Sequence, residues 1–189
     1  MICFTWLGEA YPQKWQDMTL ESFEHENLMQ VSAYATALDF ITKPCNLILW
    51  SNSPSTGKTH LAAALCQFMQ RERRWACLFA DVYHLLEALR DRNISGIVKQ
   101  AGSCDLLVLD RLEVVQQYVS ELDEILDFRH NRGKPTIITV KTESVAMTED
   151  EITGITPIIG KHATDRLWDW QLGGVTICQM GGLAYQRRS

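Results

Sequence analysis

Asn52-Ser53-Pro54-Ser55-Thr56-Gly57-Lys58-Thr59 is the stretch that decides the fold of this 189-residue chain. It follows the apolar run Asn46–Trp50 and precedes an Ala/Leu-rich segment, His60–Met69. A strand, a loop and a helix in this order are the context of a phosphate-binding loop of the pattern G-x-x-x-x-G-K-[ST]. Its end, Gly57-Lys58-Thr59, is intact, whereas Asn52 replaces the opening glycine. The sequence therefore predicts a nucleotide site that departs from the usual pattern at its first position.

The residues of this loop have separate predicted tasks. Backbone amides of such a loop surround the β-phosphate, the lysine neutralises charge on the β- and γ-phosphates, and the next hydroxyl binds Mg²⁺. Lys58 and Thr59 are placed for the last two tasks, at the positive end of the following helix. Asn52 can replace glycine at modest cost, because asparagine tolerates positive φ, and position 55 does not demand glycine. We expect ATP or ADP and Mg²⁺ to be bound here, by Asn52, Ser53, Pro54, Ser55, Thr56, Gly57, Lys58, Thr59 and His60; a chance G-K-T before a helix is the alternative.

A second candidate element is the segment Cys104-Asp105-Leu106-Leu107-Val108-Leu109-Asp110, in which four apolar residues precede a carboxylate. Such a strand delivers its acid to the carboxyl edge of a sheet. Asp110 would there hold Mg²⁺, through water, beside Thr59, unless it merely ends a strand. The next position, where a second acid would activate water, is Arg111, and a guanidinium cannot act as a general base. Glu113 is a candidate base only if the chain bends back, so we expect weak hydrolysis or none.

Composition narrows the classes of protein to consider. With 46% hydrophobic residues the chain can bury the core of one domain, and its net charge of −5 gives no global basic field. The six cysteines are scattered without metal-ligand spacing, which favours reduced, buried thiols. We find no apolar run long enough for a membrane span and no secretory signal at the start, so we expect a cytoplasmic setting.

Apolar runs alternate with helical patterns, which predicts an α/β domain of three layers around a mostly parallel, five-stranded sheet. The predicted helices are Leu28–Phe40, Lys58–Arg71, Tyr83–Arg90, Val119–Arg129 and His162–Trp168. Val31, Tyr34, Ala35 and Leu38 share one face of the first helix, and Asp81 is a candidate N-cap for the third. The predicted strands are Leu47–Trp50, Trp75–Phe79, Leu106–Leu109, Pro135–Val140 and Val175–Cys178.

Eight segments carry a resemblance to a known family: Thr19–Phe23, Asn46–Leu49, Gly57–Ala62, Asp105–Asp110, Ile125–His130, Lys134–Thr139, Asp165–Leu167 and Gly182–Tyr185. Their order is similar to that of the AAA+ core of the DnaC/DnaI helicase loaders and the related IstB transposition ATPases. The resemblance implies a P-loop ATPase fold over residues 23–189, after an N-terminal extension of residues 1–22. It also implies assembly with copies of the chain or a relative.

The resemblance assigns further residues, and some of them depart from the family pattern. Arg166 would be an arginine finger that reaches a neighbour's γ-phosphate; the alternative is a surface arginine paired with Asp165 or Asp169. At the sensor position, usually an asparagine, Lys141 could contact phosphate but could not orient water. Gln186 replaces a final arginine. With Asn52 and Arg111, these changes cluster on the predicted nucleotide site.

The expected function follows from the resemblance. It is an ATP-binding AAA+ protein of the helicase-loader type, acting in DNA replication by helicase loading or its regulation, with weak or no hydrolysis. Its partners would be a replicative helicase, another AAA+ protein or single-stranded DNA, in a homo- or hetero-oligomer. The alternatives are a non-catalytic adaptor or a transposition helper. Trp6, Tyr11 and Trp15 either pack back onto the core or form a partner-binding peptide.

Overall fold

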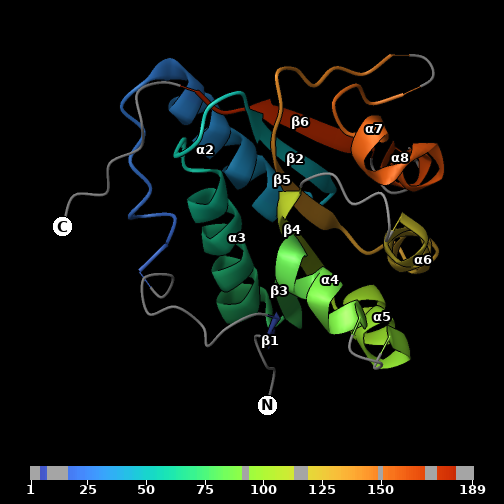
Figure 1. The fold of residues 1–189 in the computed structure, drawn as a ribbon. Coiled ribbons are helices and arrows are strands. Elements are labelled where there is room, and N and C mark those ends of the chain that lie inside the picture. Colours follow the sequence, from blue (N-terminus) through green and yellow to red (C-terminus); the bar gives the residue numbers. More distant parts are fainter. Residues whose placement is uncertain are drawn as a thin grey trace.

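The computed structural model describes residues 5–7, 17–90, 94–112, 119–148, 151–168 and 174–181. Within them, six parallel strands form one sheet in the order β1-β3-β4-β5-β2-β6 (Figure 1). The strands are β1 (Thr5–Leu7), β2 (Asn46–Ser51), β3 (Cys77–Asp81), β4 (Leu106–Leu112), β5 (Thr136–Lys141) and β6 (Val175–Gln179). The α/β class and all five predicted strands are confirmed, and β1 adds a sixth strand at the edge.

Helices cover both faces of this sheet, as the three-layer prediction requires. Figure 1 shows α2 and α3 on one face and α4 to α8 on the other. Their bounds are α2 (Leu28–Thr42), α3 (Lys58–Arg73), α4 (Val82–Arg90), α5 (Ile94–Ser103), α6 (Val119–His130), α7 (Thr156–Ile159) and α8 (Lys161–Trp168). The short helices α5 and α7 were not predicted. No helix in the described part of the chain combines the length and the apolar character that a membrane crossing requires.

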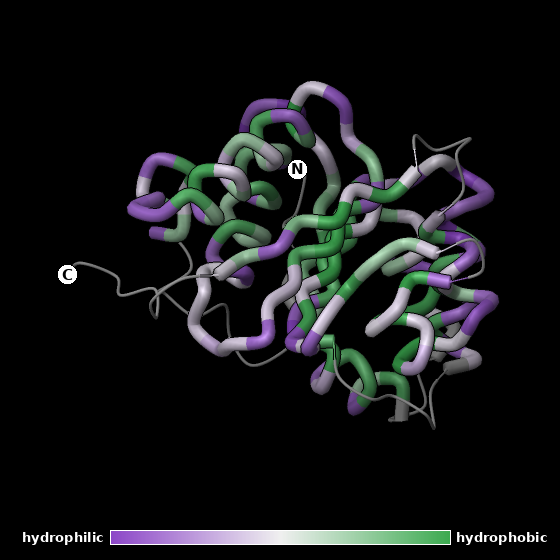
Figure 2. Tube along the Cα trace, turned by 90° about the horizontal axis from the view of Figure 1, so that it is seen from above, coloured by the Kyte–Doolittle hydropathy of each residue, from purple (hydrophilic) through white to green (hydrophobic). Residues whose placement is uncertain are grey.

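The strands are apolar on both sides because each side packs against a helical layer. In β2, Leu47 and Leu49 belong to the core cluster under α2 and α3, whereas Ile48 and Trp50 belong to the cluster under α4 to α8. This alternation follows from the period of two of a β-strand. Figure 2 shows the resulting hydrophobic centre, with hydrophilic segments toward the outside. Buried on both faces, the sheet gives a rigid edge on which loops can be positioned.

The first described segment belongs to the sheet. Strand β1 pairs in parallel with β3, and Trp6 lies opposite Phe79 in the register. Part of the predicted N-terminal extension thus packs back onto the core, while Tyr11 and Trp15 lie outside the described residues. The division of the chain at residues 22 and 23 stays a prediction.

Helix α2 packs on the core with a face other than the one singled out in the sequence. Val31 and Leu38 are 46% and 44% exposed and Ala35 is exposed as well, whereas Tyr34 is partly buried against the core cluster. The face that packs inward is formed by Gln30, Ala33, Ala37 and Phe40. Small alanines allow α2 to approach its neighbours closely, and Phe40 fills the space at the end of the helix. Because α2 carries apolar residues on two sides, helical periodicity alone could not select the buried one.

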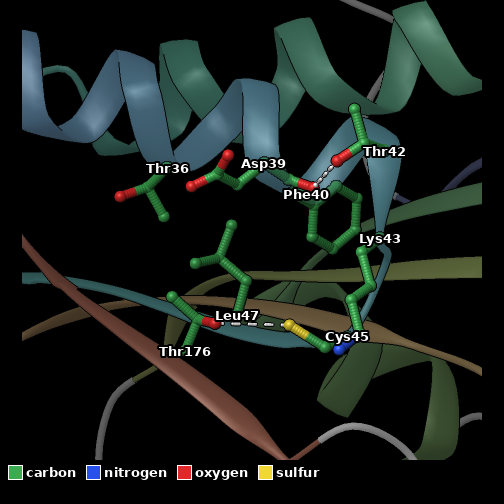
Figure 3. Close-up of a pocket in the computed structure, with 8 residues that line it drawn as sticks. All are labelled: Thr36, Asp39, Phe40, Thr42, Lys43, Cys45, Leu47 and Thr176. Carbon is green, nitrogen blue, oxygen red and sulfur yellow. Dashed lines mark hydrogen bonds between the residues drawn. The ribbon is translucent and has the colours of Figure 1, made fainter.

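A hollow of about 390 Å³ lies between the last turns of α2 and the start of β2 and β6 (Figure 3). Thr36, Asp39 and Lys43 line it from the helix side and Thr176 from β6. Cys45 Sγ lies 3.3 Å from Thr176 Oγ1 at its floor. The hollow lies at the amino end of β2, whereas the predicted phosphate loop follows its carboxyl end. It is therefore separate from the candidate nucleotide site.

Candidate nucleotide site

The predicted site residues meet at the carboxyl edge of the sheet. The loop follows β2, Asp110 lies near the end of β4, and Lys141 ends β5. In the register of β2 and β5, Ser51 lies opposite Lys141. Loops and side chains at this edge of a parallel sheet form the usual binding crevice of open α/β folds. The topology therefore brings together residues that are up to 90 positions apart in the sequence.

The loop has the backbone that a phosphate cradle needs. Gly57 is the N-cap of α3 with φ 90°, a left-handed conformation that favours glycine. Ser55 is also left-handed, with φ 53°, whereas Asn52 does not have positive φ. The expectation that Asn52 takes the strained backbone conformation is therefore wrong, and Ser55 takes it instead. Asn52 contributes its side chain, whose Oδ1 accepts a hydrogen bond of 3.1 Å from Ser53 Oγ.

Lys58 lies folded into the loop. Its Nζ donates hydrogen bonds to Ser51 Oγ at 2.5 Å, to Ser53 O at 3.2 Å and to Thr56 Oγ1 at 3.2 Å. Burial lowers the pKa of this ammonium; the Asp110 charge opposes that shift and the nearby Lys141 charge adds to it. A partly desolvated ammonium held by three neutral oxygens gains from an anionic partner. The arrangement therefore suits a phosphate group.

The hydroxyl of Thr59 and the carboxylate of Asp110, predicted to lie beside each other, are in direct contact. Thr59 Oγ1 donates to Asp110 Oδ1 at 2.9 Å and lies 3.2 Å from Oδ2. Asp110 is 1% exposed. Burial raises its pKa, and hydrogen bonds from Thr139 and Thr59, the Lys58 charge and the Arg111 amide oppose the rise. A hydroxyl beside a carboxylate is a hard-oxygen donor set that fits Mg²⁺, so the two residues would hold the ion next to the phosphates.

Thr139 is a site residue that the sequence reasoning missed. Its Oγ1 donates to Asp110 Oδ1 at 2.6 Å and accepts from the Arg111 amide at 2.9 Å. It is 1% exposed. The available signal was a polar residue near the end of the apolar run of β5, one strand away from Asp110. The motif comparison instead selected the next polar position, Lys141, which is exposed at the end of β5.

Arg111 faces away from the phosphate loop. Its guanidinium forms an ion pair with the carboxylate of Asp81, on β3. The Asp81 side chain is 4% exposed and its other oxygen accepts the Tyr83 amide at 3.0 Å, which confirms its predicted role as an N-cap. Arg111 has φ 60° at a β-bulge, where the register of β4 and β5 shifts between Leu109 and Leu112. The position expected for a second acid thus carries a cation with its own buried partner.

The side chain of His60 is turned toward the segment before α2. Its Nε2 lies 3.0 Å from Thr19 O and 3.2 Å from Ser22 Oγ, and its ring packs edge-on against Phe23 at 5.4 Å. His60 therefore ties residues 19–23 to α3, and a nucleotide contact by this residue stays a prediction. Glu113, the candidate base, lies outside the described residues, as does Gln186.

Arg166 belongs to a network between α6 and α8. Its Nε lies 2.8 Å from Asp127 Oδ1, and its Nη2 lies 3.2 Å from His162 Nε2. His162 Nδ1 in turn lies 2.6 Å from Asp123 Oδ1. The alternative of an ion pair is thus realised with Asp127 of α6; Asp165 pairs instead with Lys161, and Asp169 lies outside the described residues. Action on a second subunit's nucleotide stays a prediction.

The sheet order, the Gly-Lys-Thr loop at a helix N-terminus and the adjoining carboxylate define a P-loop nucleotide-binding fold of the AAA+ class. The chain belongs to the family of IstB-like ATP binding proteins, whose model matches residues 13–148. It is 26% identical over 165 residues to the replicative helicase loader DnaC of Escherichia coli K12, covering 80% of this chain and 63% of DnaC. It is 28% identical over 137 residues to protein YdaV of the same strain, covering 68% of this chain and 52% of YdaV.

Solved structures share the fold at lower identity. The crystal structure of the DnaC helicase loader matches with a TM-score of 0.71 and 19% identity, over 89% of this chain and 99% of that one. DnaI matches with a TM-score of 0.72 and 17% identity, over 93% and 94%. The replication initiator DnaA, bound to AMPPCP and single-stranded DNA, matches with a TM-score of 0.65 and 19% identity, over 87% and 50%. The chain spans under two thirds of the length of these curated relatives.

Proposed function

We propose that this chain binds ATP or ADP together with Mg²⁺ at the loop formed by residues 51–59. The observation that carries the proposal is the convergence of Lys58, Thr59 and Asp110 at the carboxyl edge of the sheet. Lys58 would exchange its three neutral oxygens for phosphate oxygens, and Thr59 and Asp110 would hold the ion. Bound Mg²⁺ supplies charge neutralisation between the β- and γ-phosphates. Nucleotide-bound DnaA, which shares the fold, supports this assignment.

Hydrolysis at this site is proposed to be slow or absent. General-base activation of water needs a group that can accept a proton, and a guanidinium stays protonated throughout the working range. Arg111 occupies the position next to Asp110, and its partner Asp81 is already engaged by the guanidinium and by the Tyr83 amide. Lys141, near the sensor position, adds positive charge without an acceptor for a water proton.

The proposed cellular role is in DNA replication, in helicase loading or its regulation, with a replicative helicase or another AAA+ protein as partner. The similarity to a replicative helicase loader supports this choice. Contact with single-stranded DNA, a homo- or hetero-oligomer and a cytoplasmic setting belong to the same proposal. Arg166 would serve a neighbouring subunit in such an oligomer if Asp127 released it.

A nucleotide titration tests the site itself. We expect dissociation constants in the micromolar range for fluorescent ATP and ADP analogues with Mg²⁺, and weaker binding in EDTA. Lys58→Ala should abolish binding, whereas Lys43→Ala, which changes an exposed lysine at the end of α2, should leave it unchanged. Absence of binding at millimolar ATP would refute the site and favour the non-catalytic adaptor.

An assay of phosphate release distinguishes nucleotide hydrolysis from nucleotide binding. A turnover comparable to that of active AAA+ ATPases, lost in Lys58→Ala, would contradict the proposal of weak hydrolysis without affecting that of binding.

Affinity purification of the intact chain in ATP tests the proposed cellular role. Recovery of a hexameric helicase supports loading, and recovery of a transposase moves the role to transposition.

A further inference from the structure

Helix α2 presents an apolar face to solvent. Among the residues that the structure describes, six large hydrophobic side chains are exposed, and four of these lie on α2. Leu28 is 88% exposed, and Val31 and Leu38 are about half as exposed. Ala35 lies between the last two and is also exposed. We call Leu28, Val31, Ala35 and Leu38 the α2 stripe. It lies on the side of the helix opposite the buried Ala33 and Ala37.

The spacing of the α2 stripe specifies the shape of its partner. Steps of three, four and three residues are the a/d pattern of a coiled-coil seam, narrower than the face by which a helix packs on a globular core. A partner that fits such a seam is another helix with a matching apolar stripe. Ala35 near the middle leaves room for a large side chain of that helix. The stripe therefore predicts helix-on-helix packing.

The charges around the stripe disfavour polyanions and lipid surfaces. Residues 28–42 contain one acid, Asp39, and neither lysine nor arginine. A helix that binds phosphate backbones or anionic membranes carries basic residues beside its apolar face. Depletion of charge in the centre of a patch is instead typical of the core of a protein–protein interface.

The stripe is complementary to itself. Positions 28, 31, 35 and 38 are symmetric about position 33, so the pattern reads the same from both ends. A second α2 related by a two-fold axis and running antiparallel places Leu28 against Leu38 and Val31 against Ala35. The two leucine pairs then close the ends of the seam, and the smaller Val31–Ala35 pairs fill its middle. One patch that serves both partners in this way is the property that an isologous dimer requires.

Charge selects the antiparallel pairing over the parallel one. A parallel pair would place Asp39 of one helix beside the other Asp39, and Lys43 beside Lys43. An antiparallel pair directs Asp39 toward the positive N-terminal end of the other helix. It also brings Lys43 to the end where Glu26 lies, and both residues are exposed. Each charged group gains from the antiparallel arrangement.

We propose that α2 is a self-association helix, and that two copies of this chain pair antiparallel through Leu28, Val31, Ala35 and Leu38. A hollow of about 310 Å³ beside Leu28, bounded by Met29 of α2 and Ile177 and Gln179 of the edge strand β6, leaves space for the partner's Leu38. The pairing uses no residue of the nucleotide loop, so it stands independently of the proposed nucleotide site.

Complementary charge variants test both the surface and the pairing. Light scattering of the full chain in EDTA without nucleotide should give a mass near twice 21.6 kDa at about 100 µM. Leu28→Glu and Leu38→Lys should each weaken the dimer by about tenfold or more, because each places a charge against an apolar side chain. Both charges complement the dipole of their own helix end, so the monomers should remain folded.

Mixtures of two variants test whether the two α2 helices pair antiparallel. Leu28→Glu mixed with Leu38→Lys should restore a dimer, because antiparallel pairing places Glu against Lys. Leu28→Glu mixed with Leu28→Lys should not restore it, and restoration there would overturn the antiparallel arrangement. Tyr83→Glu, which charges an exposed aromatic residue on α4, should leave the dimer intact. A monomeric wild-type chain at about 100 µM, or single variants that dimerise normally, would overturn the proposal and leave the stripe to a different protein.

Discussion

Replacement of the buried Arg129 should destabilise the chain strongly. The side chain of Arg129 is 1% exposed, and the residue lies near the end of α6. Its Nε donates to Thr136 Oγ1 at 2.9 Å and its Nη1 donates to Ala101 O at 2.7 Å and Cys104 O at 3.0 Å; Nη2 donates to Pro135 O. Burial lowers the pKa of the guanidinium, and the Cys104 and Asp105 side chains oppose that shift. Arg129 thus joins the starts of β4 and β5, the strands that carry the acid and hydroxyl of the candidate site.

The expected loss in the free energy of unfolding follows from these contacts of Arg129. A hydrogen bond to a charged group contributes about 1.5–3 kcal/mol, and a buried carbonyl that loses its donor costs about 1–3 kcal/mol. The guanidinium itself costs several kcal/mol to bury, which offsets much of the gross gain. For Arg129→Met we therefore expect a loss of about 3–5 kcal/mol in the free energy of unfolding. In a domain of this size the loss corresponds to a fall in Tm of about 6–20 °C.

Urea unfolding followed by circular dichroism and tryptophan fluorescence measures this loss. Arg129→Lys, which keeps the charge without the planar fork, should lie between wild type and Arg129→Met. Arg132→Met is the matched control: this exposed arginine lies 3.5 Å above the ring of Phe128, a contact that contributes about 0.5–1 kcal/mol. If Arg129→Met loses no more stability than Arg132→Met, the reasoning about the buried guanidinium is refuted.

Three further predictions concern the site and its supports. Thr139→Val should lower the affinity for Mg²⁺-nucleotide about tenfold by removing the hydroxyl on Asp110, while Thr139→Ser should retain it, as a titration with fluorescent nucleotide would show. Burial raises the pKa of Asp105, but bonds from Lys134 and a backbone amide lower it more, so the net pKa is lowered. The pair of Asp105 and Lys134 is about one-third exposed, so it stabilises the fold by less than about 1 kcal/mol. This stabilisation should be present at neutral pH and lost as the pH falls through the folded pKa of Asp105. Asp105→Asn should show less of this acid dependence in urea melts. Gly102→Ala should lower the Tm measured by circular dichroism, because the added Cβ would lie 2.6 Å from a ring carbon of Phe128 on α6.

Much of the fold could be predicted because its signals are local. Five strands are apolar runs between turn residues, and the loop from Asn52 to Thr59 fixes where the first of them ends. The buried face of α2 could not be predicted in the same way, because a second apolar stripe on the same helix gave a competing periodicity. Strand β1, only three residues long, forms by pairing with β3, a contact that local sequence does not encode.

The candidate site shows the same difference between local motifs, which could be predicted, and contacts between strands, which could not. Lys58, Thr59 and Asp110 were predicted because their motifs have fixed spacing, and the structure brings them together. Thr139 was missed because its role depends on β5 lying beside β4, which is a property of strand order. The partner of Arg111 was missed for the same reason, since Asp81 comes from the neighbouring strand β3. Non-local pairing in the sheet decides both cases.

The pair formed by Arg111 and Asp81 also constrains which single substitutions this site can accept. Exchanging Arg111 alone for glutamate would set two carboxylates against each other, one of them 4% exposed, at a backbone position with φ 60°. Exchanging Asp81 alone would leave a guanidinium without its buried partner and remove the cap of α4. Either single step lowers stability before any gain in catalysis. Placing an acidic pair at the end of β4 without losing stability therefore requires two coupled substitutions, one at Arg111 and one at Asp81.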